Sequence, residues 1–335
     1  MKKPASSFLH PDRRQFLASA AASAAALSLP RSAHAAGPAP ANRQKILVDT
    51  DIGDDIDDAF ALALALSSQR ELEMVGITTA WGPTGKRARI VSKLLHVAGQ
   101  GQIPVHAGVK TSDATPDQYP WAASFDDTGK VGNDGPGFIL DQLGRAPGEI
   151  TLVCIGPLTN IGAAIERDAA GFRKVKKVVM MGGSVAYSYK DLGYTAPTGP
   201  VPEYNIYSDV AAARKLFASG VPIVMAGLDV TNMLKLDEVK RGLLFKDNSP
   251  LTEALALLYH QWGQRTPTLF DVMTIGLLLD PGLCRTEPLH VRIENNGLTR
   301  MVAGAKPNVQ AGVDAQVDRF FHLLLGRLLQ QRLGA

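Results

Sequence analysis

Short apolar runs alternate with longer helix-like stretches along most of the chain. Residues 45–49 form an apolar run that ends in acid, and residues 57–68 follow with apolar residues at helical length. The alternation continues with predicted strands at 73–78, 150–155, 177–181 and 221–225 and predicted helices at 86–97, 158–166 and 209–219. This order predicts an α/β fold, an open, mostly parallel, doubly wound sheet with helices on both faces. Ligands of such folds lie at the carboxyl ends of the strands.

The predicted strands 46–48 and 178–180 are apolar at every position, as burial on both faces requires. Two stretches rich in Gly, Pro, Tyr and Asp, residues 111–137 and 184–202, interrupt the pattern. We expect these two stretches to form flaps over a site. The sequence shows no internal repeats and no internal linker. We therefore expect residues 36–335 to form one domain.

The first 35 residues have the layout of a secretory signal. Its parts follow in the usual order: a basic start at Lys2-Lys3, the pair Arg13-Arg14, an Ala-rich apolar stretch at 18–29 and the small-x-small sequence Ala33-His34-Ala35. The paired arginines predict a twin-arginine signal peptide, export of the folded protein and a periplasmic location. The apolar stretch is shorter than a membrane span, so no membrane association is expected after cleavage.

The net charge of the chain depends on this segment. The 335 residues contain 35 Lys and Arg against 32 Asp and Glu, a formal charge of +3. Five basic residues and one acid lie in the first 35 positions, so the remaining chain has a charge of −1. A near-neutral chain offers no electrostatic basis for nucleic-acid binding. The 45% hydrophobic content excludes a disordered chain, and two Cys exclude a disulfide-built miniprotein.

The segment richest in candidate chemistry is Asp49–Asp58, with six carboxylates in ten residues between a predicted strand and a predicted helix. Like charges this close raise one another's pKa unless a cation neutralises them. A solvated acidic turn is the alternative, but the carboxyl end of the first strand is where α/β folds build sites. All-oxygen donors suit a hard cation, calcium or magnesium, better than zinc.

Two other acidic-loop chemistries fit this spacing less well. An EF-hand loop needs Glu at its twelfth position, and counted from Asp49 that position is Phe60. The haloacid-dehalogenase phosphatases use Asp-x-Asp-x-Thr/Val, and here Gly53 stands where Thr or Val should be. A metal-dependent phosphatase therefore stays as the nearest rival enzyme class.

Together with later motifs, the acidic loop resembles the inosine-uridine-type nucleoside hydrolases. The amino-terminal signature of that family is similar to Val48-Asp49-Thr50-Asp51 followed by Asp57-Asp58-Ala59. The resemblance covers residues 45–325 in order, through Gly76-Ile77-Thr78-Thr79, Gly156-Pro157-Leu158-Thr159-Asn160-Ile161, Met180-Met181-Gly182-Gly183, Pro202-Glu203-Tyr204-Asn205, Gly227-Leu228-Asp229-Val230-Thr231 and Phe270-Asp271. It implies an open α/β fold, a calcium ion, hydrolysis of ribonucleosides to free base and ribose, and a dimer or tetramer.

Carried over position by position, the resemblance implies roles for individual residues. Asp51 would be both a metal ligand and the general base that activates the attacking water. The other implied metal ligands are Asp58, Asp271 and the backbone carbonyl of Ile155. The implied or candidate substrate-binding residues are Asp57, Asp55, Glu203, Asn205, Trp81 and Phe270. These residue types suit the reaction, because carboxylates stabilise the oxocarbenium character that develops on the sugar.

The sequence departs from the family pattern in the loop and at the ribose. Residues 52–56 separate Asp51 from the Asp-Asp pair, two residues more than in the family, so Asp54 or Asp55 could replace Asp57 at the ribose or join the metal. Pro83 stands where the family has Asn, and the Asn before the Glu-x-Asn motif has no clear match. These differences favour the alternative of a nucleoside- or sugar-binding protein that has lost efficient catalysis.

Phe270 stands where pyrimidine-specific and broad-specificity members carry His. An aromatic ring here resembles the purine-preferring members, in which stacking on the base assists its departure, so purine nucleosides are the favoured substrates. Because Phe cannot donate a proton, His260 is the nearest candidate acid in sequence, with ordinary packing as its alternative. Trp81, Trp121 and Trp262 are candidate stacking partners of the base, and core packing is the alternative for each.

Overall fold

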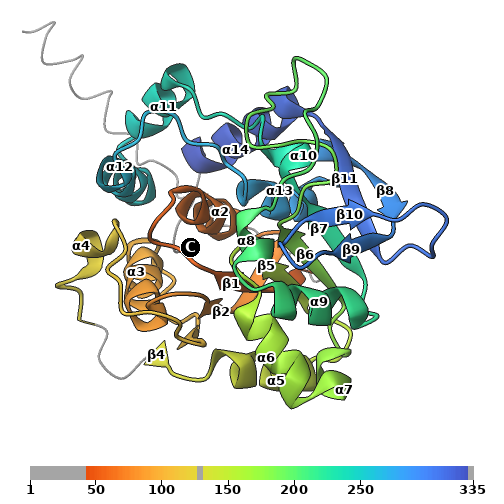
Figure 1. The fold of residues 1–335 in the computed structure, drawn as a ribbon. Helices are drawn as coiled ribbons and strands as arrows, with labels where there is room; N and C mark the ends of the chain where they lie inside the picture. The colour runs from red at the N-terminus through yellow and green to blue at the C-terminus, as the bar shows by residue number, and fades with distance from the viewer. Residues whose placement is uncertain (1–42, 127–130, 331–335) are drawn as a thin grey trace, which may run out of the picture. The chain divides into compact units, whose positions relative to one another are not determined.

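The computed structural model describes residues 43–126 and 131–330, which are built around a nine-stranded sheet (Figure 1). The spatial order of the strands is β4-β3-β2-β1-β5-β6-β7-β11-β8. Their bounds are β1 (Gln44–Thr50), β2 (Leu72–Thr79), β3 (Val105–Ala107), β4 (Val131–Gly132), β5 (Thr151–Cys154), β6 (Lys177–Met181), β7 (Ile223–Ala226), β8 (Cys284–Leu289) and β11 (Val309–Ala315). Every pairing is parallel except that of β8 with β11. The predicted signal peptide lies outside the described residues.

Thirteen α-helices and a small hairpin complete the described part of the chain. The helices are α2 (Asp57–Leu66), α3 (Thr84–Val97), α4 (Tyr119–Ala122), α5 (Gly135–Arg145), α6 (Thr159–Arg167), α7 (Ala169–Phe172), α8 (Tyr204–Tyr207), α9 (Val210–Ala218), α10 (Leu228–Thr231), α11 (Glu238–Phe245), α12 (Pro250–Trp262), α13 (Val272–Leu279) and α14 (Val317–Leu329). The hairpin pairs β9 (Val291–Ile293) with β10 (Thr299–Met301), and a 3₁₀ turn, η2 (Pro281–Leu283), precedes β8. None of the described helices combines the length and apolar character of a membrane span.

Strand β1 is apolar throughout because its two faces join two different cores. Ile46 and Val48 pack in the core that contains α2, α3, α13 and α14, whereas Leu47 packs in the core of α5, α6 and α9. Figure 1 shows α2 and α13 on one side of the central strands and α5 and α6 on the other. All ten residues of α2 are buried, which explains why its sequence is apolar on every side after the first two acids.

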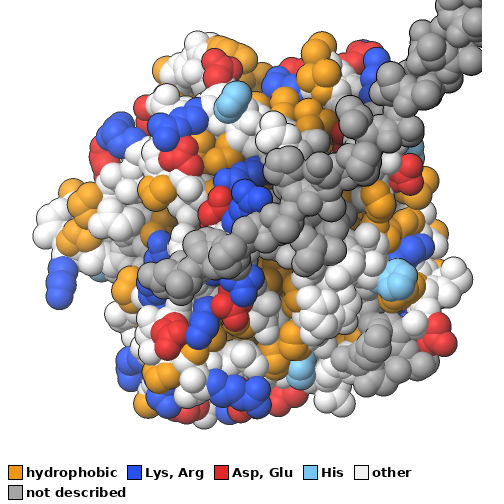
Figure 2. Space-filling view, turned by 180° about the vertical axis from the view of Figure 1, so that it is seen from behind, with side chains coloured by type: hydrophobic (Ala, Val, Ile, Leu, Met, Phe, Trp, Pro, Cys, Tyr) orange, Lys and Arg blue, Asp and Glu red, His pale blue; other side chains and the backbone are white. Residues whose placement is uncertain are grey.

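The predicted α/β architecture is confirmed, and the predicted elements from 45–49 to 221–225 all occur with ends displaced by at most a few residues. The strands between residues 284 and 315 are not predicted from the sequence pattern. Strand β11 inserts between β7 and β8, so residues 309–315 complete the sheet by pairing with β8 and with β7, which lies more than 80 residues earlier in the chain. On the face shown in Figure 2, charged side chains of both signs are interspersed.

The order of the strands places a crevice at β1. From β1 the chain winds outward through β2, β3 and β4, and then returns to β5 on the opposite side of β1. In open parallel sheets, ligands bind at the carboxyl ends of the strands where the winding reverses. A ligand site is therefore expected among the residues that follow β1 and β5.

Candidate active site

A cavity of about 460 Å³ lies at this position, within the size range of small-molecule sites. Nine of its lining residues are predicted site residues: Asp51, Asp55, Asp57, Asp58, Ile155, Glu203, Asn205, Phe270 and Asp271. The structure thus brings together residues that lie up to 220 positions apart in the chain. Trp81 is not among the described residues that line this cavity, but its indole Nε1 donates a hydrogen bond of 3.1 Å to Tyr204 Oη, which does line it.

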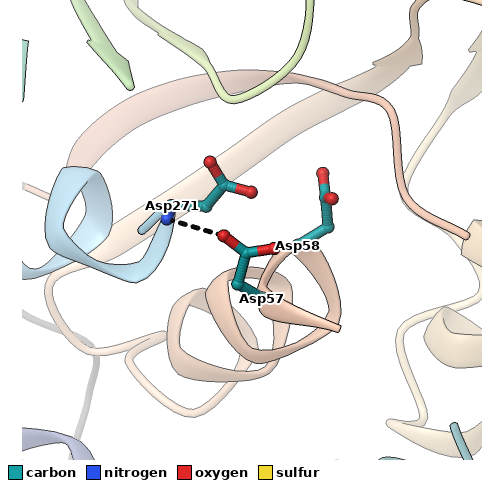
Figure 3. Close-up of side chains that lie close together, drawn as sticks. All are labelled: Asp57, Asp58 and Asp271. Carbon is teal, nitrogen blue, oxygen red and sulfur yellow. Dashed lines mark hydrogen bonds between the residues drawn. The ribbon is translucent and has the colours of Figure 1, made fainter. Parts of the chain in front are cut away.

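Three carboxylates of the cavity form a tight cluster: Asp57, Asp58 and Asp271 each offer an oxygen within 4.8 Å of the others. Figure 3 shows Asp57 and Asp58 at the start of α2 and Asp271 just before α13, with their carboxylates turned toward one another. The backbone N of Asp271 donates to Asp57 Oδ2 at 3.2 Å. Asp271 occupies the N-cap position of α13 without a capping hydrogen bond from its side chain, so helix capping does not explain this residue.

The electrostatics of the cluster favour a bound cation. Burial raises the pKa of Asp57, Asp58 and Asp271 well above the ordinary value, and the neighbouring carboxylates raise each of them further. Thr50 Oγ1 donates a hydrogen bond to Asp58, a small compensation for three buried acids. Divalent metals neutralise such repulsion, and an all-carboxylate donor set fits a hard cation such as calcium. The cluster can therefore hold a metal ion.

Asp51 lies beside this cluster, outside the group of three. Burial raises the pKa of Asp51 to about 6, and the charge of Arg87 opposes this shift. Asp51 in turn raises the pKa of Asp58 and Asp271. A Cβ at Gly156 would lie 2.8 Å from Asp51 Oδ1, so the glycine after Ile155 leaves room for this carboxylate at the end of β5.

The longer acidic loop separates its acids into different environments. Asp57 joins the cluster, whereas Asp54 makes an ion pair of 2.7 Å with Arg87 and Asp55 accepts a hydrogen bond from the backbone N of Ile56 at 2.6 Å. Both Asp54 and Asp55 still line the cavity. In this geometry Asp57 has the position closest to the other carboxylates.

Glu203 and Asn205 line the cavity from the start of α8. Glu203 is the N-cap of α8, and its carboxylate accepts hydrogen bonds from the backbone N atoms of Gly183, Asn205 and Ile206 at 2.9, 3.0 and 3.2 Å. Burial raises the pKa of Glu203 to about 7 despite these bonds. Asn205 Nδ2 donates to the backbone O of Met181 at 3.2 Å, so both side chains have fixed positions.

Aromatic rings form a further part of the wall. Phe270 and Tyr189 meet edge to face with ring centroids 6.0 Å apart, and Tyr189 Oη accepts a hydrogen bond of 2.9 Å from the backbone N of Tyr204. Lys235 Nζ lies 5.9 Å from the Phe270 ring, and burial lowers the pKa of this lysine. His260, the acid candidate on α12, instead contacts the ring of Tyr259 at 5.6 Å.

Two further lining residues, Asp54 and Trp262, are alternatives that the sequence suggests, and five are not predicted from the sequence: Asp117, Met181, Tyr189, Tyr204 and Gln264. Two of them had a detectable signal. Asp117 and Tyr189 belong to the stretches 111–137 and 184–202, whose composition predicts flaps over a site. Trp262 was a stacking candidate with core packing as its alternative, and it is both 8% exposed and part of the cavity wall.

Comparisons with known proteins identify the family. A family model described as inosine-uridine preferring nucleoside hydrolase matches residues 46–322. The pyrimidine-specific ribonucleoside hydrolase RihA of Citrobacter koseri is 31% identical, with 84% of this chain and 97% of that protein covered. Uridine nucleosidase 1 of Arabidopsis thaliana is 30% identical, with 76% and 80% covered. A solved structure, the plant nucleoside hydrolase PpNRh1, matches with a TM-score of 0.75 and 26% identity over 86% of this chain and all of that one.

Proposed function

The chain belongs to the inosine-uridine preferring nucleoside hydrolase family, and on this premise we propose that it is a calcium-dependent enzyme that prefers purine ribonucleosides. The products would be the free base and ribose. The observation that carries the calcium proposal is the buried cluster of Asp57, Asp58 and Asp271, whose mutual repulsion needs a cation.

In the proposed site Asp51, Asp58, Asp271 and the backbone carbonyl of Ile155 would hold the calcium ion. Asp57 shares the cluster and lines the cavity, and we propose that it contacts the ribose beside the ion. Calcium, when bound, supplies Lewis acidity to the attacking water and orients the vicinal hydroxyls of the ribose. Asp51 is proposed to take the proton of the water, because it is the buried carboxylate beside the cluster that is not one of its three members.

The residues at the start of α8 are proposed to position the sugar. Glu203 and Asn205 are proposed to bind ribose hydroxyls from a rigid framework, since each is already fixed by backbone hydrogen bonds. Asp55, which lines the cavity, is proposed as a further contact of the substrate. The carboxylates of Glu203 and of the aspartates that line the cavity would stabilise the positive charge that develops on the sugar as the C–N bond breaks.

The purine preference rests on the aromatic wall. Phe270 and Tyr189 present ring surfaces to the cavity, which suits the larger purine base. The relatives named above are a uridine nucleosidase and a pyrimidine-specific hydrolase, so the identity of the base needs a direct measurement. Phe270→His is expected to shift the kcat/KM ratio toward uridine, and an unchanged ratio would contradict the role of this ring.

The decisive experiment is a reducing-sugar assay with inosine, adenosine, guanosine, uridine and cytidine, with and without a chelator. We expect ribose release to be fastest from the purine nucleosides, to stop in the chelator and to return with calcium. Full activity in the chelator would overturn the calcium proposal, and faster release from uridine or cytidine would overturn the purine preference.

We also propose that residues 1–35 are a twin-arginine signal peptide, that residues 36–335 form the enzyme domain in the periplasm, and that the mature protein is a dimer or tetramer. The twin-arginine pattern at Arg13-Arg14 supports the first point. Replacing both arginines by lysine should leave the protein in the cytoplasm, as cell fractionation would show. Light scattering of the purified mature protein measures the oligomeric state, and a monomer would contradict the last point.

A further inference from the structure

Arg87 is a buried cation next to the acidic loop. It lies one turn into α3, its side chain is among the largest of those fully buried, and the residue is only 2% exposed. Charged side chains are rarely buried to this extent without a specific set of partners. The groups that accept hydrogen bonds from the Arg87 guanidinium therefore indicate what this side chain does.

All three guanidinium nitrogens of Arg87 make hydrogen bonds to segments that frame the cavity. Nη1 donates to the backbone O of Asp51 and, at 2.9 Å, to the backbone O of Ile52. Nη2 donates to Asp54 Oδ2 at 2.7 Å, and Nε donates to the backbone O of Trp81 at 2.8 Å. One side chain thus fixes the turn that carries Asp51 and also the segment that follows β2.

The segment after β2 needs such support because its backbone is strained. Trp81 has a φ of 57°, in the left-handed region that side chains other than Gly rarely adopt. The indole of Trp81 reaches Tyr204, whose ring lines the cavity. Arg87 therefore connects the acidic loop, through Trp81, to Tyr204 in the lining of the cavity.

We propose that Arg87 is a positioning residue, which holds the carboxylate of Asp51 in place for metal binding and proton transfer. The proposal rests on the proposed function, in which Asp51 is the base and a ligand of calcium. It also explains how a loop two residues longer than the family pattern keeps Asp51 in place, because Arg87 binds the inserted stretch at Ile52 and Asp54. Residues that orient metal ligands typically change metal affinity or activity by about 10- to 100-fold when replaced.

The test compares Arg87→Lys with a matched control, Arg241→Lys. Arg241 is also buried, at 8% exposure, and donates to the backbone O of Leu236 at 2.6 Å, but its guanidinium lies against Tyr259, away from the acidic loop. For Arg87→Lys we expect kcat to fall about 10-fold or more, KM to change less than about 3-fold, and calcium affinity measured by calorimetry to fall about 10-fold. Both variants should lower the thermal midpoint, whereas Arg241→Lys should leave kcat and calcium affinity within about 2-fold of the wild type.

A loss of thermal stability without any change in kcat or calcium affinity would overturn the proposal. Arg87→Met combined with Asp54→Asn is a second variant, which keeps the apolar stem and removes the charge of the partner. Failure of both Arg87 variants to fold would assign Arg87 to folding alone and would also overturn the proposal. Wild-type activity that persists in a chelator would instead contradict the calcium proposal, and the kcat comparison between Arg87→Lys and Arg241→Lys would still test the positioning of Asp51.

Discussion

Two groups of buried aspartates differ in the number of hydrogen-bond donors around them. Asp229, on α10, is 4% exposed, and its carboxylate accepts hydrogen bonds from the backbone N atoms of Val185, Ala186 and Tyr187 at 2.9, 2.7 and 3.2 Å. Asp58, which is 3% exposed, accepts a hydrogen bond from Thr50 and faces two further carboxylates. Asp229 and Asp58 are thus buried to a similar extent, but hydrogen-bond donors surround Asp229 whereas like charges surround Asp58.

The surroundings of the aspartates also shift their pKa values in opposite directions. Hydrogen bonds from the backbone N atoms of Ser188 and Thr198 lower the pKa of Asp191, on the same loop that Asp229 anchors. Burial and like charge raise the pKa of Asp58 and Asp271. The number of donors thus separates an aspartate that stabilises a loop from one that needs a cation.

The largest difference is expected in activity. Asp51→Asn, on the donor-poor side, should lower kcat by roughly 10²- to 10⁴-fold, because Asn cannot accept the proton of the attacking water. Asp229→Asn, on the donor-rich side, should leave kcat of the folded protein within about 3-fold of the wild type. Initial rates of ribose release from inosine at saturating calcium measure both variants. A wild-type rate for Asp51→Asn would remove Asp51 from the mechanism.

Stability should change with opposite sign in the two regions. Asp229→Asn should destabilise the fold by about 1–3 kcal/mol, because at least one backbone N–H of the loop loses its acceptor. Asp271→Asn should raise the thermal midpoint of the metal-free protein, because it removes a charge from three repelling carboxylates. Thermal unfolding in a chelator measures both effects. A decrease for Asp271→Asn would show that the cluster is stabilising without a cation.

The pH dependence of stability follows from the raised pKa values. A carboxyl group whose pKa is higher in the folded state stabilises the fold at low pH, and this contribution is lost as the pH rises from the unfolded value to the folded value. Burial raises the pKa of Asp51 to about 6 and of Glu203 to about 7, so the metal-free protein should lose stability between pH about 4 and about 7. Thermal midpoints measured across this range in a chelator test the expectation, and calcium should flatten the profile. A midpoint that rises with pH in the chelator would contradict these shifts.

An exposed aspartate should show the smallest effect. Asp134 pairs with Arg167 at the surface at 2.6 Å, and it caps α5 by accepting a hydrogen bond from the backbone N of Gly137 at 3.0 Å. Asp134→Asn keeps the capping oxygen and loses only the exposed ion pair, so the free energy of unfolding should change by less than about 0.5 kcal/mol. Chemical denaturation measures this value. A change as large as that of Asp229→Asn would mean that burial does not distinguish these residues.

Much of the fold could be predicted because its signals are local. The apolar strands at 45–49 and 177–181 and the helix at 57–68 are each recognisable within a short window, and the structure confirms them. The strands between 284 and 315 are harder to recognise, because Cys284–Leu289 is largely exposed and β9 and β10 have three residues each. The place of β8 in the sheet depends on β11, which pairs with the distant strand β7, and local patterns do not encode such pairing.

The site was predicted less completely than the fold. Six acids within ten residues indicated a metal site, but the sequence alone could not show that Asp57 lies closer to Asp58 and Asp271 than Asp51 does. Arg87 belongs to a predicted helix, and its role depends on a three-dimensional contact with a loop more than 30 residues earlier. Tyr204 likewise reaches the cavity through the turn at Glu203, which no periodicity indicates.

The position of Asp271 has a consequence for biosynthesis. Asp57 and Asp58 are made early, but their cluster partner follows more than 200 residues later, and β11, which covers the free edge of β7, comes later still. During translation, a chain that ends before residue 271 lacks the third carboxylate, and its acids on α2 cannot form the complete cluster. Tight binding of a cation therefore reports that nearly the whole polypeptide has been synthesised and folded.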